Sequence, residues 1–309
     1  MMDQQPTFSL IIPTYQRPAQ LSTCLRALAH LDYPRDRFEV IVVDDGSETP
    51  VDKVVAPFMD ELTVILLRQS NAGPATARNT GAARAHGQFL AFTDDDCAPA
   101  PDWLCTLAAR FAVTPTDAIA GRTLNALPDN PYATASQLLV SFLFTYHNAD
   151  PSQARFATTS NLALPADTFR ALKGFDPTFP FPGGEDYELC TRWLSHGYRL
   201  RYAPEVVVYH THLLNLRTFW RQHFHYGCGV SDMRRASVSW AEEQRRQPPF
   251  FRRLFYYVCT QTRGRQTARL MALLVMSQVA TLAGFFWEQR RQSLAARARG
   301  VGGGVTKQG

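Results

Sequence analysis

The chain has 309 residues and a formal net charge of +5; 45% of its residues are hydrophobic and 19% are charged. This composition supports a sizeable apolar core and excludes disordered, collagen-like and coiled-coil proteins. The six cysteines form no CxxC pair and no dense framework, so neither a structural zinc site nor a disulfide scaffold is expected. The length favours one large α/β unit with an appendage over two equal domains.

Charge is distributed unevenly along the chain. Residues 213–309 carry 16 Lys and Arg against 4 Asp and Glu, whereas residues 1–212 carry 16 against 23. A basic C-terminal region favours an anionic partner such as a membrane surface or nucleic acid. No nucleic-acid-binding fold is recognisable, so nucleic acid is not expected. The N-terminal residues lack the basic leader and apolar core of an export signal, which predicts a cytoplasmic protein at the cytoplasmic face of the membrane.

The first hundred residues alternate between strand and helix patterns. Apolar, β-branched runs at 8–12 and 38–43 predict buried strands, and residues 19–31 between them have the leucine spacing of a helix. This βαβ unit implies parallel strands. A strand, a helix and a strand follow at 62–67, 75–85 and 88–93. Polar residues follow these strands, at the edge where open α/β sheets bind ligands.

The pattern is weaker after residue 100. We expect a helix at 103–113, a strand at 160–164, a loop rich in Gly, Pro and Phe at 172–184, and a helix at 185–197. A final strand at 206–212 would place His210 and His212 on the same face. The chain is therefore predicted to divide into a domain at 1–215 and a basic, partly apolar helical region at 216–309, with a loose tail at 300–309.

An apolar segment occurs within the basic C-terminal region. Residues 270–287 are 18 residues without a charge, and arginines flank them on both sides. As a helix with about 1.5 Å per residue they would extend about 27 Å, at the lower limit for a membrane span. Three alternatives stay open: a helix on or partly in the membrane, a true span, and a soluble core or dimer helix. Aromatic residues mixed with arginines at 250–257 are typical of interfacial segments.

Three consecutive carboxylates, Asp94, Asp95 and Asp96, follow the predicted strand at 88–93. Adjacent carboxylates repel one another unless a cation or a hydrogen-bond donor compensates their charge. An Asp-x-Asp pair at a strand end can hold Mn²⁺ or Mg²⁺, which favour carboxylate oxygens and also take phosphate oxygens from a substrate. The sequence therefore predicts a divalent metal that binds a diphosphate; a solvated turn is the alternative.

Further candidate residues occur at other predicted strand and helix ends. Asp44 and Asp45 follow the second strand and can accept hydrogen bonds from a nucleobase or a ribose, and Arg78 near a helix start can meet phosphate or base. Their alternatives are a plain turn and a surface arginine.

A glycine-rich loop precedes the predicted helix at 185–197. Glu185 and Asp186 follow Gly184 at the helix start, where an ionised carboxylate is stabilised and can act as a general base; ordinary capping is the alternative. His210 can complete a metal coordination sphere that a carboxylate begins, and His212 competes for that role.

Five motifs occur in a fixed order: SLIIPTYQRP at 9–18, VDDGS at 43–47, NAGPATARN at 71–79, FTDDD at 92–96 and GED at 184–186. In this order and spacing they resemble family 2 glycosyltransferases of the inverting, bacterial type, over about residues 7–215. The resemblance implies the GT-A fold, an α/β architecture with a Rossmann-like, mostly parallel sheet flanked by helices. A basic helical C-terminal extension would follow it.

The resemblance implies a role for each motif. The residues lining the nucleotide pocket would be Pro13, Thr14 and Tyr15, and the base would be contacted by Asp44 or Asp45 together with Arg78. Asp94 would face ribose or the donor sugar, Asp96 would bind the metal, and Asp186 would be the catalytic base, with Glu185 near the sugars. His210 lies where many members have a metal or diphosphate contact. Further substrate contacts are expected from Arg17, Asp95, Gly184 and Trp193.

The chain also departs from some members of that family. Processive members carry a Gln-x-x-Arg-Trp motif, whereas LCTRW at 189–193 keeps Arg192 and Trp193 without the Gln. Transfer of a single sugar is therefore expected. Residues 219–229 resemble the helix and Gly-rich turn of bacterial members that have membrane-linked acceptors.

These observations predict an inverting, metal-dependent, non-processive glycosyltransferase. The expected donor is a nucleoside-diphosphate sugar, above all a UDP-sugar, and the expected acceptor is a hydroxyl of a lipid-linked or cell-surface glycan. A sugar nucleotidyltransferase is the enzymatic alternative, although PTYQR at 13–17 is not its Gly-rich phosphate loop. A catalytically silent scaffold that binds a nucleotide sugar at the membrane is another. A dinucleotide-dependent oxidoreductase lacks its G-x-G-x-x-G motif here.

Overall fold

The computed structural model describes residues 7–179, 183–236 and 250–302. Residues 7–179 and 185–214 form one compact unit, here called the sheet unit. Residues 183–184, 215–236 and 250–302 belong to a second, called the helical unit.

The described part of the sheet unit contains one sheet of eight strands in the order β3-β2-β1-β4-β7-β6-β8-β5. The strands are β1 (Phe8–Thr14), β2 (Phe38–Asp44), β3 (Val64–Arg68), β4 (Phe89–Phe92), β5 (Cys97–Pro99), β6 (Ala118–Asn125), β7 (Leu162–Pro165) and β8 (Leu200–His210). Strands β1 to β4 are parallel, as their alternation with helices predicts. Strand β7 is antiparallel to β4 and β6, and β5 is antiparallel to β8. The predicted α/β fold is therefore confirmed.

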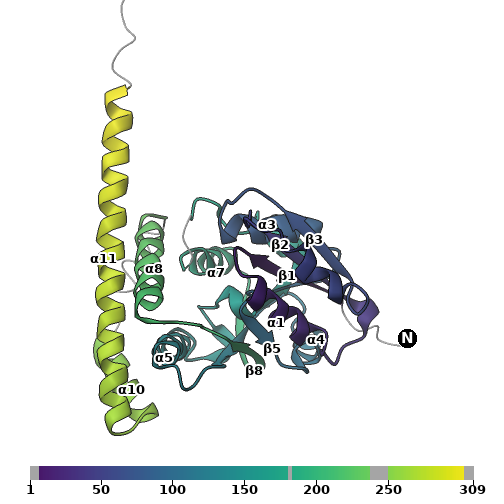
Figure 1. The fold of residues 1–309 in the computed structure, drawn as a ribbon, viewed down its shortest axis with the longest axis horizontal. Helices are drawn as coiled ribbons and strands as arrows, with labels where there is room; N and C mark the ends of the chain where they lie inside the picture. Colours follow the sequence, from purple (N-terminus) through teal and green to yellow (C-terminus); the bar gives the residue numbers. More distant parts are fainter. Residues whose placement is uncertain (1–6, 180–182, 237–249, 303–309) are drawn as a thin grey trace, which may run out of the picture. The chain divides into compact units, whose positions relative to one another are not determined.

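Helices cover both faces of the sheet (Figure 1). They are α1 (Pro18–Leu28), α2 (Asp52–Val55), α3 (Pro74–Arg84), α4 (Trp103–Val113), α5 (Pro131–His147), α6 (Ala166–Ala171) and α7 (Glu185–Ser195). Short 3₁₀ turns occur at Arg35–Arg37, Ala56–Phe58, Pro151–Gln153 and Thr159–Asn161. Because side chains alternate along β1, Leu10 packs in the core with α1 and α4, and Ile11 packs in the core with α3 and α7. Helix α3 approaches β1 closely at Gly81, where a Cβ atom would lie 2.7 Å from Cγ2 of Ile11.

The second half of the sheet contains an irregularity that sets the position of β8. Strand β6 pairs in parallel with β8, but the register shifts between Gly121, which opposes Ala203, and Arg122, which opposes Val207. The amide of Asn161 donates hydrogen bonds to the carbonyl oxygens of Arg122 and Val206, at 3.1 and 2.9 Å. Glycine at position 121 is required because a Cβ atom there would lie 2.3 Å from the Asn161 amide nitrogen. The buried Asn161 side chain therefore holds the bulge in place.

The observed elements differ from the predicted ones mainly after residue 95. Strands β5 and β6 and helices α2, α5 and α6 are absent from the prediction. Strand β8 begins at Leu200 instead of 206 and ends at His210, and β7 begins at Leu162 because the preceding residues form a 3₁₀ turn. Helix α7 ends at Ser195, two residues before the predicted Gly197.

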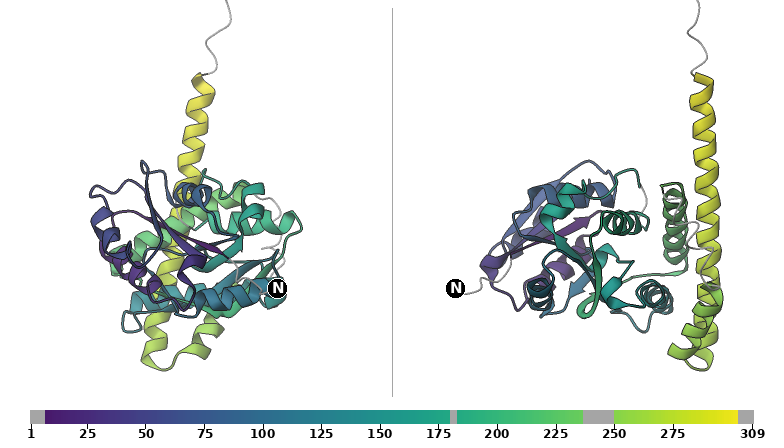
Figure 2. Two further views of the ribbon diagram at one scale, coloured as in Figure 1. Left: turned by 90° about the vertical axis from the view of Figure 1, so that its right-hand side faces the viewer. Right: turned by 180° about the vertical axis from the view of Figure 1, so that it is seen from behind.

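The helical unit contains α8 (Leu216–Ala236), α10 (Phe250–Gln261) and α11 (Arg265–Gly302). Helices α8, drawn in green, and α11, drawn in yellow, run side by side (Figure 2). A Cβ atom on Gly227 would lie 1.9 Å from the carbonyl oxygen of Thr281, and one on Gly284 would lie 1.9 Å from that of Phe224. These pairings run in opposite directions along the two helices, so α8 and α11 are antiparallel and their backbones touch at the two glycines.

This packing corrects two predictions. The Gly-rich turn expected within residues 219–229 is wrong, because α8 continues through these glycines to Ala236. Glycine serves there as a contact surface for α11 and not as a helix stop. The loose tail expected at 300–309 is wrong for residues 300–302, which continue α11, and residues 303–309 lie outside the described residues.

Candidate active site

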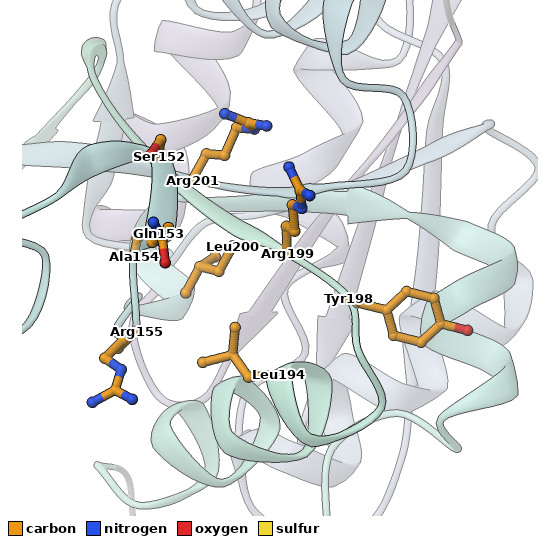
Figure 3. Close-up of a pocket in the computed structure, with 9 residues that line it drawn as sticks. All are labelled: Ser152, Gln153, Ala154, Arg155, Leu194, Tyr198, Arg199, Leu200 and Arg201. Carbon is orange, nitrogen blue, oxygen red and sulfur yellow. The ribbon is translucent and has the colours of Figure 1, made fainter.

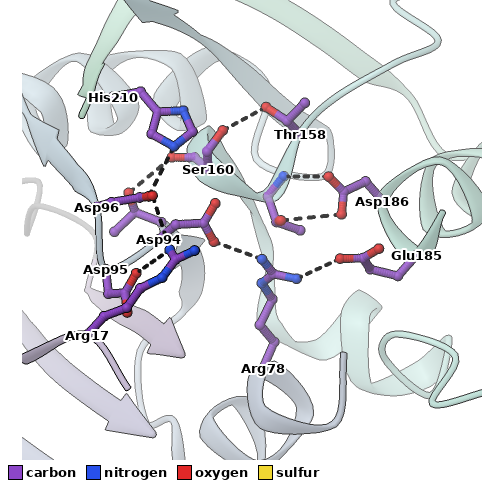
Figure 4. A network of polar contacts seen from close by, with 12 residues as sticks. Arg17, Arg78, Asp94, Asp95, Asp96, Thr158, Ser160, Glu185, Asp186 and His210 are labelled. Carbon is purple, nitrogen blue, oxygen red and sulfur yellow. Dashed lines mark hydrogen bonds and ion pairs between the residues drawn. The ribbon is translucent and has the colours of Figure 1, made fainter. Parts of the chain in front are cut away.

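The carboxyl ends of the parallel strands bring together most of the residues that the sequence singled out (Figure 4). Thr14 ends β1, Asp44 ends β2, and the carboxylates of 94–96 follow β4. Strand β5 begins directly after this triplet, and its first residue, Cys97, pairs with His210 of β8. Sheet register alone therefore places His210 next to Asp96.

Asp96 is the centre of one half of this cluster. Its Oδ1 lies 3.0 Å from Nε2 of His210, and its Oδ2 accepts a hydrogen bond from the Arg17 guanidinium at 3.1 Å. Burial opposes ionisation of Asp96, but the neighbouring His210 and Arg17 outweigh it and lower the pKa of this carboxyl. Burial likewise disfavours a charged His210, yet Asp96 raises the pKa of that imidazole. Each group therefore favours the charged form of the other, and the Asp96 carboxylate is ionised.

Ligand atoms suitable for a metal ion converge at the same place. One atom from each of Asp96, His210 and His212 lies within 4.8 Å of the others, and the ring centroids of the two histidines are 3.5 Å apart. A second such group combines Asp94 and Asp96 with the Cys97 thiol. The expectation that His210 and His212 share a side is confirmed, although His212 lies beyond the end of β8.

Asp95 has a different environment from its two neighbours. It is buried and accepts hydrogen bonds from the Thr14 hydroxyl at 2.7 Å and from Arg17 at 3.1 Å. Burial, with a smaller contribution from Asp96, raises the pKa of Asp95 to about 7. Gln16 adopts a left-handed conformation (φ 58°) between β1 and α1, and the next residue, Arg17, then reaches both carboxylates. Asp95 thus connects the start of α1 to residues 94–96, here called the acidic loop.

Arg78 of α3 joins the acidic loop to the start of α7. Its guanidinium donates to Asp94 at 2.8 Å and to Glu185 at 3.0 Å, and both Arg78 and Glu185 are buried. Burial disfavours a charged guanidinium, but Asp94 and Glu185 raise the pKa of Arg78. Three segments that are far apart in the sequence are therefore held in one arrangement by a single buried side chain.

Asp186 is held by a segment that the sequence did not indicate. Its carboxylate accepts hydrogen bonds from the backbone N–H and the hydroxyl of Thr159, at 3.2 and 3.3 Å. Burial, followed by the nearby Glu185, raises the pKa of Asp186 well above its ordinary value. A carboxylate with a raised pKa is a better proton acceptor at neutral pH, which suits a general base.

The structure does not bring every predicted residue to this cluster. Arg78 contacts Asp94 and Glu185 and not Asp44 or Asp45. The Asp45 carboxylate accepts from the side chain of Gln69 and from the backbone N–H groups of residues 72 and 73, so it organises the loop before α3.

The remaining predicted residues differ in exposure. Trp193 is buried in the core, where its indole N–H donates to the carbonyl of Arg199. Pro13 is half-buried in β1, and the Tyr15 side chain is exposed. Gly184 is buried and belongs to the helical unit, in which a Cβ atom on Gly229 would lie 2.9 Å from its nitrogen.

A separate cavity of about 610 Å³ lies in the sheet unit near the start of β8 (Figure 3). Its lining includes Arg155, Arg199 and Arg201, and Arg201 forms an ion pair with Asp117. Because β8 rises about 3.3 Å per residue, Leu200 and His210 at its two ends are about 30 Å apart. The cavity therefore lies apart from the carboxylates at 94–96 and from His210.

Replacing Arg78 is expected to destabilise the protein strongly. Arg78→Met removes the guanidinium that binds the buried Glu185, and the loss of one member of a buried ion pair costs about 3–5 kcal/mol of the free energy of unfolding. Chemical denaturation of the purified protein measures this loss. Arg84→Met, which changes an exposed arginine on the same helix, is the control. Equal stabilities of the two variants would contradict the bridging role.

The Asp96–His210 pair is expected to make stability depend on pH. Since the pKa of His210 is raised in the folded protein, its contribution is fully present below the unfolded value of about 6.5 and disappears as the pH rises through the folded value. In the presence of a chelator, the stability difference between the parent protein and His210→Gln should be larger at pH 6 than at pH 9. His30→Gln removes an exposed imidazole and serves as the control. A difference independent of pH would argue against the pair.

Comparisons with known proteins agree with this geometry. The family profile described as Glycosyl transferase family 2 matches residues 9–172, and that of the N-terminal domain of galactosyltransferase matches 144–214. Glycosyltransferase AglE of Haloferax volcanii is 31% identical over 213 residues, which cover 68% of each chain. Validoxylamine A glucosyltransferase of Streptomyces hygroscopicus is 32% identical over 228 residues, covering 65% of this chain and 54% of that enzyme. The chain thus spans about half the length of the latter relative.

Solved structures share the fold. A mannosyltransferase from Pyrobaculum calidifontis, described in complex with GDP-Man and Mn²⁺, superposes with a TM-score of 0.64 at 19% identity, over 93% of this chain and 88% of that one. TarS 1–349 of S. aureus, described in complex with UDP-GlcNAc, gives a TM-score of 0.52 at 17% identity, over 93% and 92%. The family profile covers more than half of the chain and the fold agrees with it. The chain therefore belongs to glycosyl transferase family 2 and is a glycosyltransferase with the GT-A fold.

Proposed function

We propose that this glycosyltransferase moves one sugar from a nucleoside-diphosphate sugar to an acceptor hydroxyl by a single displacement that inverts the anomeric configuration. The observation that carries this proposal is the bridge made by one buried arginine, Arg78, which binds Asp94 and Glu185 and so joins the loop that contains Asp96 to the helix start that contains Asp186. A proton acceptor and a metal-binding carboxylate are thereby fixed in one site. A metal-assisted in-line displacement at the anomeric carbon requires both of these groups.

Asp186 would take the proton from the acceptor oxygen as that oxygen attacks. Its two hydrogen bonds from Thr159 orient the carboxylate, and its raised pKa strengthens it as a base. Glu185 is adjacent to Asp186 in the sequence, but its carboxylate accepts a hydrogen bond from Arg78 instead. We therefore assign the base role to Asp186 alone and a positioning role to Glu185.

The donor set of Asp96, His210 and His212 fits a divalent metal. One carboxylate with two imidazoles favours Mn²⁺ over Mg²⁺, because Mg²⁺ prefers an all-oxygen shell. Such an ion, when bound, neutralises the charge that develops on the departing diphosphate. Arg17 now occupies one Asp96 oxygen, and it would be free to turn toward the diphosphate when a cation takes its place.

The donor is proposed to be a UDP-sugar. Both oxygens of Asp45 are engaged in the loop before α3, whereas Oδ2 of Asp44 has no hydrogen-bond partner among the described residues and lies 3.9 Å from the Arg68 guanidinium. Asp44 is therefore the better candidate to accept from the base N–H. Solved relatives are described with UDP-GlcNAc and with GDP-Man, so a nucleotide sugar is the shared partner class.

A panel of labelled nucleotide sugars with Mn²⁺ tests this proposal. Release of a nucleoside diphosphate, with a product of opposite anomeric configuration by NMR, is the expected result. Release of pyrophosphate would instead support a sugar nucleotidyltransferase, and binding without turnover would support a silent scaffold. Retention of the donor configuration would reject the single displacement, and full activity with a chelator present would reject the metal requirement.

A further inference from the structure

Helix α11 is apolar on its exposed side as well as on its buried side. Between residues 272 and 286, every exposed side chain is apolar, and we call this surface the outer face: Ala272, Val275, Val279, Leu282, Ala283 and Phe286. The opposite side, which is buried, includes Leu270, Leu274 and Ala280 as well as Ser277, Gly284 and Glu288. A surface helix normally places its apolar stripe toward the protein and its polar residues toward water. The outer face therefore needs a partner that is not water.

The pairing of α11 with α8 limits the ways in which a membrane can contact α11. By length and composition α11 is able to cross a membrane over Arg265–Leu294, with a mean hydropathy of 1.8 in its most apolar stretch and 28% of that stretch buried. However, α8 lies along it, and five of the residues 216–225 of α8 are Arg, Gln or His. Gln222, His223 and His225 flank Phe224, the contact of Gly284, and are thus level with residues inside the apolar stretch. A span would carry these polar side chains into hydrocarbon, which is costly.

Arginines flank the outer face on its own side of the helix. Arg265 and Arg269 precede it and Arg290 follows it, at the three- and four-residue spacings that keep them on the same face, and all three are exposed. Arg269 and Arg290 are separated by about 30 Å along the helix axis. An apolar stripe that has cations at both ends is complementary to a surface with an apolar interior and an anionic rim.

Helix α10 adds a second exposed apolar set to the helical unit. Phe251, Phe255 and Tyr256 are exposed by 62, 55 and 71%, and the exposed Arg252 and Arg253 lie among them. Aromatic side chains next to arginines are typical of the boundary between lipid headgroups and acyl chains. Two of the described helices of this unit therefore carry the same combination of groups.

We propose that α11 lies in the plane of an anionic lipid surface, with its outer face in the headgroup and acyl boundary, and does not span the bilayer. Helix α8 covers the side away from the lipid and keeps its own charges in water. The inference concerns the helical unit and does not depend on sugar transfer, because every measurement below reads lipid binding and none reads turnover.

Vesicle flotation of the full-length protein tests the proposal. We expect the parent protein to float with phosphatidylcholine vesicles that contain one third phosphatidylglycerol, and to bind vesicles of phosphatidylcholine alone more weakly. The triple variant Val279→Gln/Leu282→Gln/Phe286→Gln should lose at least about tenfold of the binding, because three apolar side chains no longer leave water. Arg269→Gln/Arg290→Gln should lose about tenfold on the anionic vesicles and little on the neutral ones.

The matched control is Met59→Gln/Val113→Gln, which removes exposed apolar side chains from the sheet unit and should leave flotation unchanged. Circular dichroism of each variant checks that its helices are retained. Three outcomes would overturn the proposal: no binding of the parent protein to either vesicle; a parent dimer that the triple Gln variant converts to monomers without any change in lipid binding; and resistance of the bound protein to an alkaline wash, which would indicate a span.

Discussion

Asp186→Asn is expected to bind the donor normally and to lose sugar transfer by about 10²–10⁴-fold, the usual contribution of a general base. Asparagine keeps an acceptor for the Thr159 N–H and a donor for its hydroxyl, so both contacts of the parent side chain survive. Only the ability to take a proton is removed. Calorimetric titration with the nucleoside diphosphate measures binding, and labelled-sugar transfer measures turnover.

The control for this variant is Asp167→Asn, which changes a carboxylate with 99% exposure in the first turn of α6. It should transfer sugar at the parent rate. If Asp186→Asn also does so, the proton acceptor is another group. If it loses donor binding as well as transfer, Asp186 contributes to the nucleotide pocket and the division of roles between α7 and the acidic loop is wrong.

Asp96→Ala is expected to lose donor affinity and metal stimulation together, each by at least about 100-fold, since even outer-shell partners of a metal cost about 10–100-fold when they are changed. The carboxylate is the residue common to both groups of potential ligands, and the imidazoles alone provide no anionic oxygen. Titration of Mn²⁺ into the protein with and without nucleoside diphosphate measures the effect. Asp102→Ala, an exposed carboxylate beside α4 whose side chain caps no backbone N–H, is the control.

Two results would count against this role of Asp96. One is donor binding that stays tight and independent of the metal in the variant. The other is the same loss of affinity in His210→Gln while Asp96→Ala is unaffected, since that would place the metal on the histidines.

The first half of the fold was predictable because its signals are local. Strands β1, β2 and β4 are short apolar runs buried on both faces, and α1 and α4 carry apolar residues at helical spacing. Helix α5 lacks this contrast, because apolar and small residues occur around most of its circumference. Strand β5 has three residues, and β6 is interrupted by Gly121, so neither shows a strand pattern of useful length.

The candidate site also contains residues that the sequence reveals and residues that it does not. The carboxylates at strand and helix ends could be predicted because they lie in short sequence motifs. Their partners were not, since the contact between Arg78 and Glu185 joins residues 107 positions apart and that between Thr159 and Asp186 joins residues 27 apart. Thr159 lies in a stretch without a periodic pattern, so only tertiary packing reveals it. Trp193 shows the opposite error: the motif predicts a substrate contact, whereas the side chain is buried in the core.

The bulge held by Asn161 separates the position of His210 from the length of the first half of β8. Three residues of β8, at 204–206, have no counterpart on β6, and the strand resumes its pairing at Val207. The side-chain directions beyond Val207 follow from its own pairing, which places His210 opposite Asn125 of β6 and Cys97 of β5. One residue more or fewer within 204–206 can therefore be absorbed by the bulge. The same change after Val207 would shift the register and turn the imidazole away from Asp96.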